Sequence, residues 1–149
     1  MKKTVMRGLF AAALLSAAAL PMRAWAGDWP LAVGDFWEVT DVHLKDGGEF
    51  AYAKFLAGEW RAEREFAKSK GWIKGYVILS NNNPRKGEAD LYLITITDHL
   101  ASGPEAEKRN DEYVAWAKKT NEQMVKESGN RVEIREILGS ELLQELKFK

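Results

Sequence analysis

The chain contains no cysteine among its 149 residues and only two histidines. The absence of cysteine excludes a disulfide framework, a lipid-modified cysteine, thiolate catalysis and thiolate-bound metal. The sequence also contains no G-x-S-x-G, P-loop, dinucleotide-binding or H-E-x-x-H motif. These absences argue against serine hydrolase, nucleotide-dependent and zinc-protease chemistry. No motif assigns a reaction, so the sequence is informative mainly about compartment, architecture and candidate cleft residues.

The N-terminal residues have the pattern of an export signal. Basic residues at positions 2, 3 and 7 precede an uncharged apolar run over residues 9–20, and a small-x-small triplet ends at Ala26. The run is well short of the roughly 20 residues that a bilayer-spanning helix needs. We therefore predict a bacterial signal peptide over residues 1–26 and a periplasmic or secreted domain over residues 27–149, with no membrane insertion after cleavage.

The predicted mature chain has a modest acidic excess. Cleavage removes Lys2, Lys3, Arg7 and Arg23 and no acidic residue, so 18 of the 22 basic residues remain against 22 acidic ones, a net charge of −4. Nucleic-acid-binding domains usually carry a basic excess on one face. The charge balance therefore argues against nucleic acid as a partner.

Hydrophobic periodicity predicts a single α+β domain. Strands are expected where apolar or β-branched residues alternate or run together, and helices where apolar residues recur with a period of 3.6. The expected elements are a strand over residues 36–44, a helix over 49–70, strands over 76–79 and 90–98, a helix from the Ser102 cap to about Ser128, a strand over 132–138, and a short fifth strand or docking arm over 142–148.

This order is the split βαβ arrangement of ferredoxin-like domains, βαββαβ, with an antiparallel sheet of strand order 4-1-3-2. In length, element order and C-terminal extension the chain resembles the dimeric α+β barrel superfamily, which includes antibiotic-biosynthesis-type monooxygenases and small stress or ligand-handling proteins. Residues 51–56, 66–73 and 90–95 are also similar to exported bacterial proteins with no assigned activity. The resemblance implies a homodimer whose sheets pack face to face, with a cleft between sheet and helices in each subunit.

The first predicted helix places two carboxylates on its apolar face. At 100° per residue, Glu59 and Glu63 fall within the arc that also carries Tyr52, Phe55 and Trp60. A buried, unpaired carboxylate is costly, so each must be neutral, paired or open to a water-filled cleft. One interpretation is an acid–base or substrate-orienting pair that faces a cleft. The other is that the glutamates lie at a solvent-exposed edge of the helix or pair with an arginine from the second helix.

The second predicted helix carries Arg109 and Trp116 on its inner stripe. Arg109 could anchor an anionic ligand, although such an arginine more often snorkels or pairs with a glutamate. Trp116 is one of five tryptophans outside the predicted signal. Tryptophans of this kind more often fill a core or a dimer interface than stack on a ligand.

His43 and His99 are expected at opposite ends of the sheet, so a shared metal site is improbable and we predict no metal. Asp41 and His43 share one face of the first strand and could form a carboxylate–histidine pair. Neither predicted helix contains a histidine, so the haem-ligating helical histidine of haem-handling relatives has no counterpart. We therefore predict no cofactor.

Three functions remain open at this point. The leading hypothesis is an exported homodimer that binds a small apolar or aromatic molecule, without any required enzymatic activity. The first alternative is a cofactor-independent monooxygenase or isomerase in which Glu59 or His43 takes a proton from an acidic carbon, and the second is a structural or envelope-stress protein with a filled core. An enzyme needs a cavity that reaches Glu59 and a perturbed acid, a binding protein needs the cavity alone, and a structural protein needs neither. The expected cleft is lined by Tyr52, Phe55, Glu59, Trp60 and Glu63.

Overall fold

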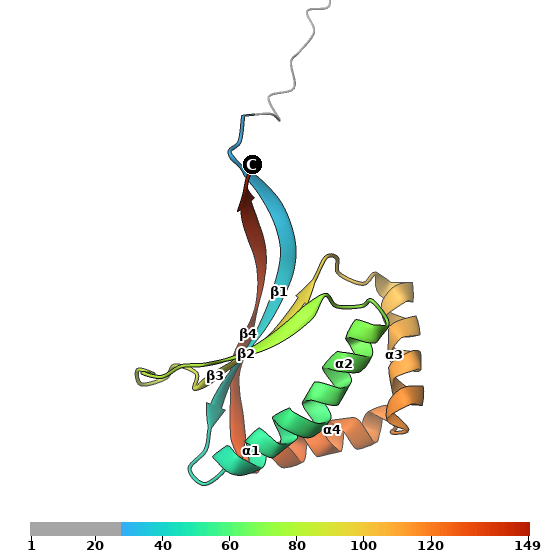
Figure 1. The fold of residues 1–149 in the computed structure, drawn as a ribbon. Helices are drawn as coiled ribbons and strands as arrows, with labels where there is room; N and C mark the ends of the chain where they lie inside the picture. Colours follow the sequence, from blue (N-terminus) through green and yellow to red (C-terminus); the bar gives the residue numbers. More distant parts are fainter. Residues whose placement is uncertain (1–27) are drawn as a thin grey trace, which may run out of the picture.

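The computed structural model describes residues 28–149, so the predicted signal peptide lies outside the described residues. It is an α+β structure in which helices lie beside one four-stranded antiparallel sheet of order β2-β3-β1-β4 (Figure 1). This confirms the predicted strand order, read from the other edge of the sheet. Among the described residues, no helix has the length and apolar character needed to cross a membrane. The elements are β1 (Leu31–Leu44), α1 (Glu49–Phe55), the π-helix η1 (Leu56–Trp60), α2 (Arg61–Ser69), β2 (Gly75–Ser80), β3 (Leu91–Thr97), α3 (Gly103–Ala117), α4 (Asn121–Asn130), the 3-10 turn η2 (Arg131–Glu133) and β4 (Arg135–Phe148).

The long strands β1 and β4 form the axis of the sheet. Trp37 of β1 pairs with Ile96 of β3 on one side and with Leu143 of β4 on the other. Beyond the ends of β2 and β3, β1 and β4 continue as a two-stranded ribbon that projects away from the helices (Figure 1). A hydrogen bond from Lys149 N to Pro30 O, 3.1 Å long, closes its tip.

The prediction of two separate C-terminal strands was wrong, because residues 135–148 form one strand. Gly139 and Ser140, which lie in the gap between the two predicted strands, pair with Asp41 and Thr40 of β1. Backbone pairing with a long neighbouring strand therefore overrides the local turn preference of the Gly-Ser pair. For the same reason β1 begins at Leu31, five residues before the predicted start at Phe36.

The prediction of one continuous second helix was also wrong. Helix α3 ends at Ala117, and Lys118 adopts a left-handed conformation with φ of 53°. Thr120 then caps α4: its Oγ1 accepts the Gln123 backbone N–H at 3.2 Å, and Gln123 Oε1 accepts the Thr120 N–H at 2.8 Å. This reciprocal cap satisfies donors at a new helix start, which favours a break over continuation of the helix.

The core lies between the sheet and the first helical layer, which is the helical run of α1, η1 and α2. Val42, on the helix-facing side of β1, is fully buried, and Tyr52 of α1 is 2% exposed. Leu56, Trp60 and Leu93 complete the cluster. Burial of these side chains supplies most of the hydrophobic stabilisation of the sheet–helix contact.

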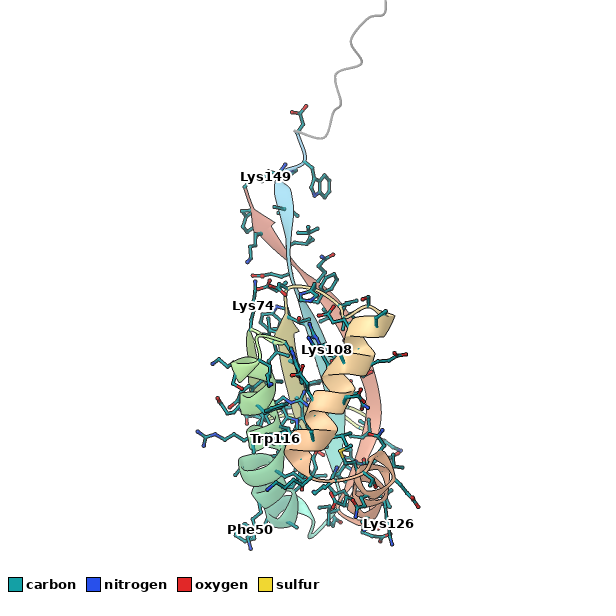
Figure 2. All side chains as sticks on the ribbon, turned by 90° about the vertical axis from the view of Figure 1, so that its right-hand side faces the viewer. Phe50, Lys74, Lys108, Trp116, Lys126 and Lys149 are labelled. Carbon is teal, nitrogen blue, oxygen red and sulfur yellow. The ribbon has the colours of Figure 1, made fainter. Side chains whose placement is uncertain are left out.

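Helix α3, which forms a second helical layer, packs against α2 through aromatic side chains. Phe66 of α2 stacks on Trp116 of α3 with ring centroids 4.6 Å apart and planes at 17°. The same phenylalanine meets Trp72 edge-on at 5.3 Å. Figure 2 shows α3 in front of the sheet with α1 and α2 beside it, so these rings hold the two layers together.

The opposite face of the sheet is left uncovered by the described helices (Figure 1). Strand alternation places apolar residues of all four strands on this face. Leu79 is 48% exposed and Leu143 is 50% exposed. The residues of this open sheet face are Trp37, Val39, Val77, Leu79, Ile94, Ile96 and Leu143.

Candidate functional site

A hollow of about 360 Å³ lies between the first helical layer and the C-terminal end of α3. Figure 2 shows Trp116 on the side of α3 that faces α2. The hollow brings together three residues that the sequence singled out, namely Glu59, Glu63 and Trp116. Its walls are formed by Glu59, Ala62, Glu63, Tyr113, Trp116, Ala117, Lys118 and Lys119.

The two glutamates reach the hollow from adjacent turns of one helical run. Glu59 lies in the π-helical turn η1, and Glu63 lies four residues later in the first turn of α2. Residues four apart lie on one side of a helix, so both carboxylates point to the same wall. Short π-helical turns inside α-helices are rare and occur frequently at functional sites. The glutamate side chains are 41% and 20% exposed, which is consistent with a solvent-filled hollow.

Glu63 is held by a tyrosine from the opposite wall. The Tyr113 hydroxyl donates a hydrogen bond to Glu63 Oε1 at 2.5 Å. Burial of the ring, and then the adjacent Glu63 carboxylate, raises the pKa of Tyr113 far above its usual value. Tyr113 therefore stays protonated at physiological pH and acts as a fixed donor in the hollow.

The next residue of α2 connects this wall to the sheet. Arg64 Nη1 donates to Thr95 Oγ1 of β3 at 3.2 Å. Its Nη2 lies 3.9 Å from Glu63 Oε2. Arg64 therefore fixes the rotation of α2 over the sheet and, with it, the direction of the Glu63 side chain.

Glu59 is balanced by a lysine from the α3–α4 connection. Lys119 Nζ lies 3.2 Å from Glu59 Oε1 and 2.6 Å from Glu127 Oε2 of α4. The pKa of Lys119 is raised, chiefly by its hydrogen bond to Glu127, with Glu59 also contributing. The left-handed turn at Lys118 brings this ammonium group to the rim of the hollow.

Trp116 supplies the apolar wall. The side chain is 40% exposed although one ring face is stacked on Phe66. Its centroid also lies 5.8 Å from that of Tyr113. The indole is therefore held in place from behind while part of it remains open to a ligand.

The three aromatic residues predicted for the same cleft lie elsewhere. Tyr52 is in the core, 5.5 Å from the Phe55 ring, and Phe55 lies under the guanidinium of Arg131 at 4.1 Å. Trp60 is 8% exposed and meets Tyr76 edge-on at 5.3 Å. These side chains face the sheet, whereas Glu59 and Glu63 face α3, so the helix presents two different sides.

Arg109 also lies outside the hollow. It pairs with Glu105 one turn earlier and approaches His99 Nε2 at 3.0 Å, with Trp72 O at 3.4 Å. The expectation that this arginine pairs with a glutamate is confirmed, but the partner is neither Glu59 nor Glu63. Arg109 borders a smaller hollow of about 170 Å³ between α3 and the sheet.

The histidines lie at opposite ends of the sheet, as predicted. His43 Nδ1 lies 2.8 Å from Asp90 Oδ2, so its carboxylate partner is Asp90 and not Asp41. His99 instead contacts Asp98 at the other end of β3. Within residues 28–149, no group of three or more histidine, aspartate or glutamate side chains is placed to hold a metal ion.

Tyr113 and Lys119, the residues of the hollow that contact the two glutamates, were not predicted as site residues. Tyr113 lies on the predicted inner stripe of the second helix, so helical periodicity could have identified it. Lys119 carries no such signal, because its position follows from the break at Lys118 that the periodicity did not reveal.

Comparison with known proteins adds no assignment to this geometry. No protein family matches the chain, and neither a curated protein nor a solved structure matches it. Function must therefore be inferred from the site itself.

Proposed function

We propose that the protein is an exported, ferredoxin-like homodimer that binds a small aromatic or apolar molecule in the hollow between α2 and α3. The observation that carries the proposal is the convergence of Glu59, Glu63 and Trp116 on one hollow of about 360 Å³. Small-molecule sites typically have volumes of about 300–1,000 Å³ and combine an apolar wall with a few polar groups. A purely structural protein needs no such hollow.

The walls indicate how a ligand is held. The exposed part of Trp116 offers a flat apolar surface that Phe66 supports from behind. Tyr113 gives its only hydroxyl hydrogen to Glu63, so the remaining acceptor positions of the Tyr113 hydroxyl and the Glu63 carboxylate can orient one hydroxyl or amine of the ligand. The combination favours a planar molecule with one polar substituent.

Binding is favoured over catalysis because both carboxylates already have partners. Glu59 is paired with Lys119, and Glu63 accepts the Tyr113 hydroxyl. A general base must be within hydrogen-bond reach of the substrate proton. In a monooxygenase or isomerase, the substrate would have to displace Lys119 or Tyr113 from its glutamate. A binding protein can keep both pairs intact.

The homodimer is proposed from the open sheet face. Leu79 on β2 and Leu143 on β4 are each about half exposed at the two edges of this face, while Val39 and Ile94 between them are shielded by their neighbours. Exposed apolar side chains on a sheet face that no helix covers can mark an interaction surface. A second copy packed face to face would cover these residues, in agreement with the layout that the chain resembles.

The binding site is tested by calorimetric titration of the mature protein with 2-naphthol. Trp116→Leu removes the apolar wall and should weaken binding by at least about five-fold. Trp29→Leu is the matched control, because Trp29 is 66% exposed and does not line the hollow. Equal affinity of the two variants would contradict the proposed site.

The assembly and the natural ligand are tested together by native mass spectrometry of protein purified from its own cell envelope. The proposal predicts a dimer of the chain cleaved after Ala26, with an additional small mass that is lost on denaturation. A monomer would argue against the face-to-face dimer. Retention of residues 1–26 would argue against export by signal cleavage.

A further inference from the structure

A second hollow, of about 440 Å³, lies at the end of β1, between the β2–β3 loop and β4. None of its residues belongs to the hollow between α2 and α3. It therefore needs an explanation independent of the function proposed above. Its walls are formed by His43, Pro84, Arg85, Lys86, Gly87, Glu88, Asp90, Glu136 and Leu138.

The imidazole of His43 is oriented by an aspartate that the backbone itself holds in place. His43 Nδ1 lies 2.8 Å from Asp90 Oδ2, and the same oxygen accepts the Leu44 N–H at 2.8 Å. The Asp90 N–H donates to Val42 O at 2.9 Å. Since Asp90 fixes Nδ1, the second ring nitrogen, Nε2, remains for a ligand. The side chain is 47% exposed, so this nitrogen is accessible.

Some of the charged side chains around His43 have an ion-pair partner and others do not. Glu88 is engaged by Arg85, whose Nε lies 2.6 Å from Glu88 Oε1. Across the part of the chain that the structure describes, no hydrogen bond or ion pair engages the Lys86 ammonium. Glu136 faces His43 as its cross-strand neighbour on β4 and is the one lining carboxylate with no such partner there.

We infer that this hollow binds a compact oxyanion, the carboxylate or phosphate group of a small metabolite, between the His43 imidazolium and the Lys86 ammonium. Asp90 compensates the charge of the imidazolium, so its Nε2–H can donate to the anion. Lys86 supplies the second cationic contact from the loop. Glu136 opposes the anion and limits its affinity.

The anion needs a proton on both ring nitrogens, because Nδ1 faces Asp90 and only a protonated Nε2 can donate to an anion, so binding should strengthen as pH falls. The carboxylates that face the ring are Asp90, Glu88 and Glu136, and the cations are Arg85 and Lys86.

The test is a titration of the mature protein at constant ionic strength, followed by NMR of the His43 ring nitrogens. The probes are acetate and sulfate; sulfate has the tetrahedral shape of a phosphate group but keeps its charge between about pH 5 and 8. We expect a saturable shift of Nε2 and tighter binding at pH 5 than at pH 8. Preference for acetate would assign the site to carboxylates, and preference for sulfate to phosphate groups. No saturable shift with either probe would overturn the inference.

Substitutions separate an anion site from a cation site. Lys86→Gln should weaken binding of the preferred probe by about five-fold, whereas Lys126→Gln on α4 should leave it unchanged. Glu136→Gln removes the repulsive carboxylate and should tighten binding of the anion. Weaker binding in the Glu136 variant would overturn the inference, because a carboxylate that helps binding belongs to a cation site.

The His43 variant distinguishes this site from the α2–α3 hollow. His43→Gln should weaken binding of the preferred anion by about ten-fold or more and abolish its pH dependence. Binding of 2-naphthol should not change, since His43 is absent from that hollow. Persistence of pH-dependent anion binding in the His43 variant would overturn the assignment.

Discussion

The hydrogen bond between Tyr113 and Glu63 links the stability of the two helical layers to the candidate site. Tyr113→Phe removes only the hydroxyl that donates to Glu63 Oε1 at 2.5 Å. A hydrogen bond to a charged group contributes about 1.5–3 kcal/mol to stability. Because the Glu63 side chain is 20% exposed, water can replace part of that bond. We therefore expect a loss of about 1–2 kcal/mol in the free energy of unfolding, or about 4–8 °C in Tm for a domain of this length.

The assay is urea unfolding of the mature protein at pH 7, with Tyr76→Phe as the matched control. Tyr76 donates an equally short bond to Glu65, but at an exposed position, so its loss should cost clearly less than the loss of the Tyr113 hydroxyl. Equal effects of the two substitutions, or stabilisation by Tyr113→Phe, would refute the reasoning. That result would mean that the Tyr113–Glu63 hydrogen bond makes no net contribution to the free energy of unfolding.

The same substitution has a pH signature. Burial of the ring, followed by the Glu63 carboxylate, raises the pKa of folded Tyr113 above that of an unfolded tyrosine, which is about 10. The stabilisation is therefore fully present below about pH 10 and is lost as pH rises above it, because the unfolded chain releases the proton first. Tyr113→Phe should make the loss of stability above pH 10 less steep. An unchanged slope would show that Tyr113 is not tightly held.

Three further predictions concern the helix break, the pH response and the assembly. Thr120→Ala removes the cap of α4 and should cost about 1 kcal/mol in urea unfolding, while Thr120→Asn should cost little. The pKa of His99 is raised by Asp98 and then by Glu105, so the contact between this loop and α3 should hold at pH 6 and weaken as pH rises through the folded pKa, measured as lower amide protection factors, corrected for the intrinsic exchange rate, around residues 98–105. Leu143→Lys places a charge in the open sheet face and should convert the proposed dimer to a monomer in sedimentation.

Each of these has a contrary outcome. A tolerated Thr120→Ala would mean that packing rather than capping sets the break. Protection factors that do not change with pH, or that are lower at low pH, would contradict the sign derived for His99. A Leu143→Lys variant that remains a dimer would place the interface elsewhere; Leu146→Lys is the control, because Leu146 lies on the projecting ribbon outside the open sheet face.

The architecture was largely predictable because it depends on local periodicity. Alternating residues and helical arcs indicated an α+β chain, and the order of the elements led to the sheet order that the structure shows. The shared direction of Glu59 and Glu63 was equally accessible, because a spacing of four residues determines it whatever the helix packs against.

The partners of these residues were not predictable, because they come from distant parts of the chain. Glu59 meets Lys119 across 60 positions only because the chain turns at Lys118. His43 selects Asp90, 47 positions away, over Asp41 in its own strand. Strand spacing alone could not decide this choice, because side chains two apart on one strand can also meet, as Lys147 and Glu145 do on β4 at 3.1 Å.

The sequence by itself therefore determined the class of the fold, the order of its strands and the shared direction of the two glutamates, since each follows from a repeat of two or 3.6 residues. Only the tertiary structure decided where the second helix breaks, which side of the first helix borders a hollow, and which charges meet there. Helix capping, backbone pairing with a distant strand and side-chain packing compete to decide these features. Their free energies are summed over contacts between distant residues, which no local sequence pattern contains.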